Sequence, residues 1–119
     1  MTKPSAIKLK RAYEAPERED GRRILVDRVW PRGIRKEAAA VDRWLKDVAP
    51  STALRQWFGH DPERSAEFRR RYRAELEKHR EAPAELRRLA RDGTLTLIHG
   101  ARGPFRNQAV VLRELLLER

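Results

Sequence analysis

Alternating apolar and polar residues near the start of the chain predict a half-buried β-strand. In residues 5–13, isoleucine and leucine at positions 7 and 9 alternate with lysines at positions 8 and 10. The continuous apolar run Ile24-Leu25-Val26 predicts a second strand, within residues 22–30, that is covered on both faces. Pro31 and Gly33 follow this run and are expected to end the strand.

Apolar residues at helical spacing predict helices in the rest of the chain. They recur every three or four positions in Glu37–Val48, which predicts one helix there. Further helices are predicted to begin after Ser51 or Thr52, after Asp61, after Pro83 and at Pro104. The last two are separated by the β-branched sequence TLTLI at residues 94–98, which predicts a third, buried strand. We expect Trp44, Trp57 and Phe58 to be mainly buried, because each lies on an apolar helical stripe.

Strands that alternate with helices are typical of an α/β fold. The expected architecture is a single compact domain over residues 1–119, with a small, at least partly parallel sheet of about three core strands flanked by helices. Residues 23–29 and 94–99 are predicted to be parallel strands that are neighbours or near-neighbours. The carboxyl ends of parallel strands share one edge of the sheet, where ligands bind in open α/β sheets.

Composition narrows the class of partner. The chain has 119 residues, with 28 basic and 18 acidic side chains, a formal charge of +10 and no cysteine. A strongly basic protein favours anionic partners such as nucleic acid, phosphorylated metabolites or acidic proteins. The apolar runs are too short for a signal peptide or a membrane span, so we expect a cytoplasmic protein. The pattern specifies no oligomeric state.

Two segments follow the two most buried strands and carry the candidate site. DRVWPRG, residues 27–33, places two arginines at a strand end, where their charges repel each other unless an anion or a carboxylate lies nearby. IHGARGPFRN, residues 98–107, joins a strand to a predicted helix, and helix N-termini bind anions. The predicted ligand-binding residues are Arg28, Trp30, Arg32, Gly33, Ser51, Arg55, His99, Arg102 and Asn107. The structural alternative is a simple turn, with Trp30 packed under a helix and Asp27 paired with Arg28.

Conventional catalytic and cofactor motifs are absent from the sequence. It contains no GxxxxGK[ST], GxGxxG or GxSxG motif and no metal-binding histidine spacing, so we expect neither a cofactor nor a metal site. His99 and Asp27 are the candidates for proton transfer. The residues leave open whether the site is catalytic or only binds an anion or a phosphate-bearing small molecule.

A second hypothesis is a DNA- or RNA-binding module that acts through its basic surface. Residues 69–73, RRRYR, interleave an aromatic residue with arginines, and Trp30 or Trp57 offers a surface for base stacking. However, Tyr72 shares a helical face with Phe68 and Leu76, which predicts that it is part of the core. The arginines alternate with glutamates, which indicates a solvated and self-paired helix face.

The order of segments along the chain is also informative: IKLKRAY, GRRILVDRVWPRG, WLKDVAPSTALRQWFGHD, FRRRYRAEL and TLTLIHGARGPFRNQAVVLRELL. Together they resemble the YeaO-like family of small bacterial proteins, a domain-of-unknown-function family, from about Ile7 to Leu117. VDRVWPRG and APSTALRQWFGH are the most specific parts. The resemblance implies a compact cytosolic α/β domain with no established reaction, and it marks Asp27, Arg28, Trp30, Pro31, Arg32, Gly33, Pro50, Ser51, Leu54, Arg55 and Phe58. His99 and Arg102 stand where similar members often have Tyr and Lys, so chemistry through a phenol or an amine would differ here.

Overall fold

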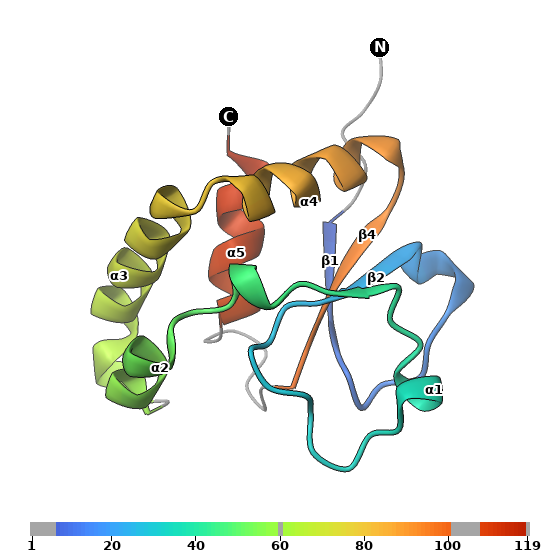
Figure 1. Ribbon diagram of the computed structural model, residues 1–119, viewed down its shortest axis with the longest axis horizontal. Coiled ribbons are helices and arrows are strands. Elements are labelled where there is room, and N and C mark those ends of the chain that lie inside the picture. Colours follow the sequence, from blue (N-terminus) through green and yellow to red (C-terminus); the bar gives the residue numbers. More distant parts are fainter. Residues whose placement is uncertain (1–6, 60, 101–107, 119) are drawn as a thin grey trace.

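The computed structural model describes residues 7–59, 61–100 and 108–118 of the chain (Figure 1). In chain order the elements are β1 (Ile7–Arg11), η1 (Arg18–Asp20), β2 (Arg22–Leu25), α1 (Lys36–Ala39), β3 (Arg43–Trp44), η2 (Lys46–Val48), α2 (Thr52–Phe58), η3 (Pro62–Arg64), α3 (Ser65–Lys78), α4 (Glu81–Asp92), β4 (Leu95–His99) and α5 (Gln108–Leu117), where η marks a 3₁₀ helix. Strands alternate with helices, so the α/β class predicted from the sequence is confirmed.

The four strands form one parallel sheet in the order β1-β4-β2-β3. Ile7 lies opposite Leu95 in the first pair, and Arg22 lies opposite the same leucine in the next. The prediction that the second and third sequence-derived strands are parallel neighbours is therefore confirmed. β2 is shorter than expected and ends at Leu25, although the N–H of Val26 still donates to the carbonyl of Ile98, at 3.0 Å.

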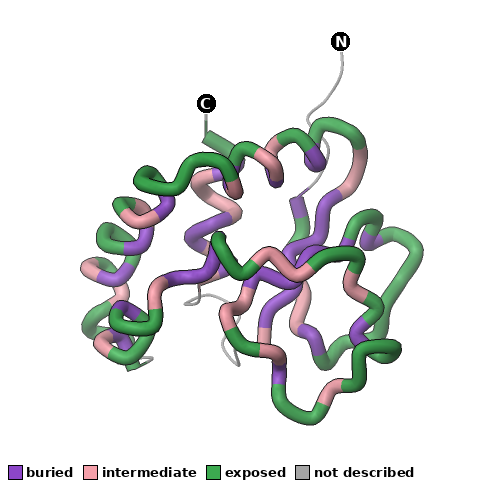
Figure 2. The backbone as a smooth tube through the Cα atoms, in the orientation of Figure 1, coloured by how far each residue is buried: buried purple, intermediate pink, exposed green. Residues whose placement is uncertain are grey.

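One face of the sheet carries the main hydrophobic core. α5 packs on β1 and β4, α4 packs on β4, and α3 and α2 complete the helical layer (Figure 1). The buried stripe of α3, formed by Phe68, Tyr72 and Leu76, joins Leu97 and other strand residues in this core. Buried positions follow the strands and recur along the helices in Figure 2. Tyr72 is therefore a core residue, as its spacing predicted.

The opposite face of the sheet is covered by irregular chain. Leu25 and Ile98 point to this side, and Trp30, Ile34 and Trp44 pack against them. The indole rings of Trp30 and Trp44 meet edge to face, with centroids 5.5 Å apart. Both indole N–H groups donate to backbone carbonyls, that of Trp30 to Ile34 and that of Trp44 to Asp27. This aromatic layer replaces the second layer of helices found in larger α/β folds.

The predicted helix over residues 37–48 is wrong. The segment instead forms the single-turn helix α1, a left-handed residue at Ala40 (φ 49°), the short edge strand β3 and the 3₁₀ turn η2. Trp44 and Leu45 follow one another at the end of β3 and pack in clusters on opposite faces of the sheet. A continuous helix would place both side chains on one stripe. Because both faces of the sheet must be covered by apolar side chains, a strand forms here in spite of the helical spacing.

Helix boundaries set by local signals agree with prediction at α2 and before α3, but α4 begins at Glu81 and not after Pro83, because a proline is tolerated in the first turn of a helix. Ser51 is the N-cap of α2 and accepts a hydrogen bond from the N–H of Leu54, and Gly59 ends that helix in the left-handed region. The Asp61 side chain caps the 3₁₀ turn that leads into α3. The predicted start of the last helix at Pro104 lies outside the described residues. Phe58 is buried, whereas Trp44 and Trp57 are only partly buried.

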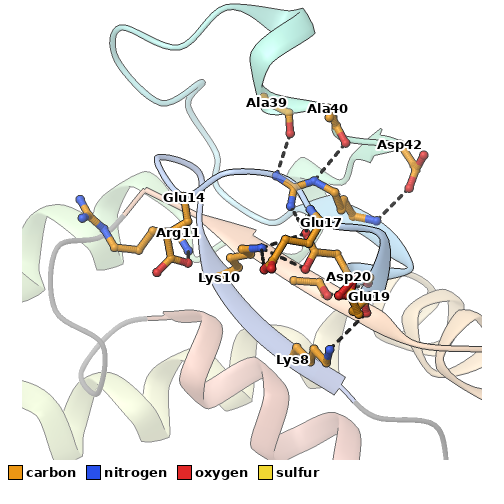
Figure 3. Close-up of polar contacts among 12 residues, drawn as sticks. Lys8, Lys10, Arg11, Glu14, Glu17, Glu19, Asp20, Ala39, Ala40 and Asp42 are labelled. Atoms are coloured by element: carbon orange, nitrogen blue, oxygen red, sulfur yellow. Dashed lines mark hydrogen bonds and ion pairs between the residues drawn. The ribbon is translucent and has the colours of Figure 1, made fainter.

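A buried charge network fixes the irregular layer to the sheet (Figure 3). Arg23 and Asp20 are 4% and 3% exposed and form an ion pair, and Lys10 donates to the same carboxylate at 3.1 Å. The guanidinium of Arg23 also donates to the carbonyls of Ala39 and Ala40. Because these carbonyls belong to the end of α1, one buried arginine links strand β2 to the segment that covers it.

The basic run on α3 is largely neutralised within the protein. Arg70 and Arg71 pair with Glu67 one turn earlier, while Arg69 pairs with Glu114 of α5 and Arg73 pairs with Glu118, just after α5. The predicted self-pairing of this face is therefore confirmed, and its partners come partly from a second helix.

Candidate functional site

A cavity of about 220 Å³ lies at the carboxyl edge of the sheet, the edge at which β1, β2 and β4 end. It is lined by Tyr13, Asp27, Arg28, Pro31, Arg32, Ala49, Pro50, Arg55, Phe58, Phe68, Gly100 and Gln108. The predicted meeting of the segments that follow β2 and β4 occurs here, through Asp27 and Gly100. Helices α2, α3 and α5 supply the remaining walls.

Asp27 joins the two strand-end segments. One carboxylate oxygen accepts the N–H of Gly100 at 2.8 Å, and the other accepts the side-chain amide of Gln108 at the start of α5. Its backbone carbonyl accepts the Trp44 indole N–H at 2.6 Å. Burial raises the pKa of Asp27, while the hydrogen bonds from Gly100 and Gln108 and the charge of Arg55 act in the opposite direction. A β-carbon at position 100 would lie 3.2 Å from this carboxylate, so glycine permits the close approach.

Arg28 is held in place by backbone carbonyls. Its Nε donates to Pro50 at 3.0 Å and its Nη2 donates to Ala49 at 3.3 Å, just before α2 begins. The side chain is partly buried. Its fixed guanidinium forms a wall of the cavity without forming an ion pair in the described part of the chain. The alternative in which Asp27 pairs with Arg28 does not occur.

Arg32 and Arg55 supply exposed positive charge to the same cavity. Their guanidinium groups form neither ion pairs nor hydrogen bonds with other residues of the ranges 7–59, 61–100 and 108–118. Arg55 acts on Asp27 only through its charge. The hydroxyl of Tyr13 donates to the backbone carbonyl of Arg32 at 3.0 Å and so ties the turn after β2 to the end of β1.

Several predicted site residues lie away from this cavity. The Trp30 ring packs in the aromatic layer, and Gly33 occupies the turn with φ 82°. Ser51 is engaged by Glu75, which accepts its N–H at 2.8 Å and its hydroxyl at 2.6 Å. Arg102 and Asn107 lie outside the described residues.

His99 is buried at the end of β4, with only 3% of its surface exposed. It lies opposite Arg11 in the register of β1 and β4, and it does not line the cavity. Burial lowers the pKa of His99, the charge of Arg11 lowers it further, and Glu14 opposes this effect. The neutral imidazole is therefore favoured. His99 does not share the cavity with Arg28, Arg32 and Arg55.

Sequence reasoning missed Tyr13, Gln108 and Phe68 as cavity residues, whereas the family resemblance had marked Phe58. Phe58 of α2 and Phe68 of α3 stack with centroids 4.3 Å apart, and both line the cavity. Tyr13 had a usable signal, because it follows a predicted strand whose carboxyl end belongs at the same edge. Gln108 had none, since its position depends on how the chain returns from β4 to α5.

The described ranges, 7–59, 61–100 and 108–118, contain no cluster of three or more histidine, aspartate or glutamate side chains suited to a metal ion. No helix within these ranges is long and apolar enough to cross a membrane.

The comparisons with known proteins agree on one family. The family described as "Inactive DUF488-N3 subclade" matches residues 6–119. The chain is 45% identical over 116 residues to the uncharacterized protein Rv3073c of Mycobacterium tuberculosis, which covers 98% of each chain. It is 44% identical over 110 residues to the uncharacterized protein YeaO of Escherichia coli, covering 92% of this chain and 96% of YeaO. No solved structure matches. The chain belongs to the DUF488-N3i family, and its resemblance to YeaO-like proteins is confirmed.

Proposed function

We propose that this protein binds a small anion, such as a phosphate-bearing metabolite, in the cavity at the carboxyl edge of its sheet. The observation that carries the proposal is that Arg28, Arg32 and Arg55 all line one cavity of about 220 Å³. None of the three guanidiniums forms an ion pair with a described residue, and those of Arg32 and Arg55 form no hydrogen bond with one either. Guanidinium groups form paired, charge-assisted hydrogen bonds with phosphate and carboxylate.

The spatial arrangement favours recognition of an anion over simple solvation of the charges. Arg28 is already oriented by two carbonyl groups, so binding would cost it little side-chain entropy. Arg32 sits on the turn after β2 and Arg55 on α2, so the two charges approach the cavity from separate elements. An anion between them would relieve the repulsion among three like charges.

We propose binding without a chemical reaction. The matching family is described as an inactive subclade, and this description supports a non-catalytic role for the present chain. Of the two candidates for proton transfer, His99 does not line the cavity and Asp27 is occupied by two internal donors. Binding a ligand, and reporting or storing it, requires neither residue to exchange a proton.

Nucleic acid remains the competing ligand because the formal charge is +10. The arginines of α3 are paired with glutamates, which leaves that helix with little free positive charge. A concave site with unpaired arginines therefore favours a small anion over an extended polyanion.

The test is to titrate the full chain with inorganic phosphate and with glycerol 3-phosphate, and to measure binding by isothermal titration calorimetry. Charge reversal at Arg32 or Arg55 (R32E, R55E) is expected to weaken binding at least about tenfold, because each removes a charge-assisted contact. Arg91→Glu provides the matched control, since Arg91 is an exposed arginine of α4 and does not line the cavity.

Saturable binding with one ligand per chain, sensitive to Arg32 and Arg55 but not to Arg91, supports the proposal. Equal weakening by all three variants contradicts it, because the charge of the whole surface would then be responsible. Tight binding of a single-stranded oligonucleotide with steep salt dependence, and no binding of either phosphate compound, would favour the nucleic-acid hypothesis instead.

A further inference from the structure

A carboxylate in a cavity lined by arginines is unexpected for a site that binds only an anion. Asp27 lines the cavity together with Arg28, Arg32 and Arg55, yet it forms no ion pair with any of them. Its negative charge repels an incoming phosphate, so a site selected for anion affinity alone would be better served by an uncharged residue. Its bonds to Gly100 and Gln108 give the carboxylate a structural role, and its remaining lone pairs allow a second role in ligand binding.

Asp27 retains capacity to accept further hydrogen bonds. An ionised carboxylate offers about four lone-pair sites on its two oxygens. Among the residues of the ranges 7–59, 61–100 and 108–118, each oxygen accepts one donor, the N–H of Gly100 on one and the amide of Gln108 on the other. These two donors also fix the orientation of the carboxylate, because one follows directly after β4 and the other begins α5. A donor on a bound ligand would therefore meet an acceptor that is already oriented.

The other walls show where the rest of such a ligand would lie. Phe58, Phe68, Pro31 and Pro50 provide an apolar surface with no side-chain donor or acceptor. The positive charges of Arg32 and Arg55 stand on exposed positions. The cavity thus combines cationic, apolar and hydrogen-bond-accepting walls.

We infer that the cavity is selective for a small phosphate ester that carries a hydroxyl group, which donates to Asp27 while the phosphate binds Arg32 and Arg55. This inference rests on the proposed function, since it names the ligand class of the same site. A hydroxyl is favoured over an ammonium group because three guanidiniums line the cavity and repel a further cation. The positive charge of Arg55 already favours the ionised carboxylate of Asp27, which reduces the advantage of a cationic group on the ligand.

The experiment compares three probes of similar size with the full chain: glycerol 3-phosphate, propyl phosphate and phosphoethanolamine. Propyl phosphate has the same carbon chain as glycerol 3-phosphate but lacks its hydroxyl groups. Glycerol 3-phosphate is expected to bind at least about tenfold more tightly than propyl phosphate, since a hydrogen bond to a charged acceptor is being gained. Phosphoethanolamine is expected to bind more weakly than glycerol 3-phosphate.

The outcomes separate the two proposals. Equal affinity for glycerol 3-phosphate and propyl phosphate overturns the hydroxyl inference and leaves the anion site in place. Tighter binding of phosphoethanolamine also overturns it, because Asp27 would then select an ammonium group. Absence of binding by all three probes overturns the proposed function itself.

Asp27→Asn tests whether this residue is the acceptor. The variant is expected to lose the preference for glycerol 3-phosphate over propyl phosphate, while its affinity for propyl phosphate is retained or increased because a repulsive charge is gone. Retention of the full preference overturns the assignment to Asp27. Binding of propyl phosphate reports an intact cavity, and if the variant fails to fold, the wild-type comparison of the two esters decides alone.

Discussion

Asp20 and Asp27 are both withdrawn from water, yet their pKa values move in opposite directions. Burial alone would raise the pKa of Asp20, but the N–H of Glu17 and the cations Lys10 and Arg23 together lower it. Burial also raises the pKa of Asp27, and there the hydrogen bonds from neutral groups and the charge of Arg55 do not outweigh it. These two aspartates therefore have opposite effects on how the free energy of unfolding depends on pH.

The free energy of unfolding should respond oppositely to loss of the two charges. The folded pKa of Asp20 lies below its unfolded value, so its stabilisation is present above the unfolded pKa and is lost as pH falls through the folded one. For Asp27 the folded pKa is the higher, so its stabilisation is present below the unfolded pKa and is lost as pH rises through the folded one.

Urea denaturation across the acidic range checks this prediction, with wild type, D20N and D27N measured in parallel. The stability difference between wild type and D20N should grow as pH rises, and that between wild type and D27N should shrink. A D27N difference that grows with pH would contradict the raised pKa of Asp27.

Gly21 and Gly33 both have positive φ angles, but only Gly21 is also enclosed. A β-carbon at position 21 would lie 2.3 Å from the carbonyl oxygen of Thr94, whereas at position 33 nothing lies within 4 Å. Gly33→Ala is expected to cost about 1 kcal/mol from backbone strain. Gly21→Ala should cost more, about 3 kcal/mol, because the backbone at Thr94, just before β4, must also move. Denaturant midpoints of the two variants measure the difference, and equal midpoints would contradict the steric argument.

Residue-scale features could be predicted where their cause is local. The caps at Ser51 and Asp61 and the turn at Gly33 depend on side chains or φ angles within a few positions, and the sequence indicates them directly. The partners of Asp27 could not be predicted. Gly100 and Gln108 lie 73 and 81 residues away along the chain, and only the arrangement of β2, β4 and α5 brings them to one carboxylate.

At the scale of elements, the incorrect helix over residues 37–48 shows where spacing misleads. Apolar residues three and four apart fit one helical stripe, but they fit a short strand between two turns equally well when both faces of the sheet need cover. Val41 and Trp44 go to the layer over Leu25, and Leu45 and Val48 go to the main core. The sequence contains no local signal that the second face lacks a helix.

The attachment of this segment depends on Arg23, which gives a second test at the element scale. Arg23→Met removes the buried partner of Asp20 and the donors to two α1 carbonyls. The buried carboxylate of Asp20 is then compensated only in part, with Lys10 as its one described cationic partner, so the free energy of unfolding should fall by about 3 kcal/mol. Arg22→Met, at an exposed neighbouring position, should change it by less than about 0.5 kcal/mol.

Urea titrations of both variants give the comparison, and hydrogen exchange of the amides in residues 39–45 shows whether the segment has loosened. A small effect of Arg23→Met, similar to that of Arg22→Met, would mean that the apolar contacts of Trp30 and Trp44 hold the layer without the charge network.

At the scale of the whole molecule, the fold class followed from the alternation of strands and helices, because a helical crossover between strands implies parallel pairing. The order of strands did not follow from it. β4 takes the central position between β1 and β2, and Ile7 pairs with Leu95 across most of the chain. The position of the cavity could be predicted because the carboxyl ends of parallel strands share one edge. Predicting Tyr13 and Gln108 as lining residues would have required the strand order and the position of α5.

The central position of β4 has a consequence for biosynthesis. β1 and β2 are made early but meet only through a strand at residues 95–99, so a nascent chain on the ribosome cannot join β1 to β2 until that strand has emerged. Until then the run Ile24-Leu25-Val26 has the two-residue strand β3 as its one available partner among the described elements. Folding is therefore expected to begin only after residues 95–99 have emerged and to proceed as a unit, with the unpaired strands exposed to chaperones or to other chains in the interval.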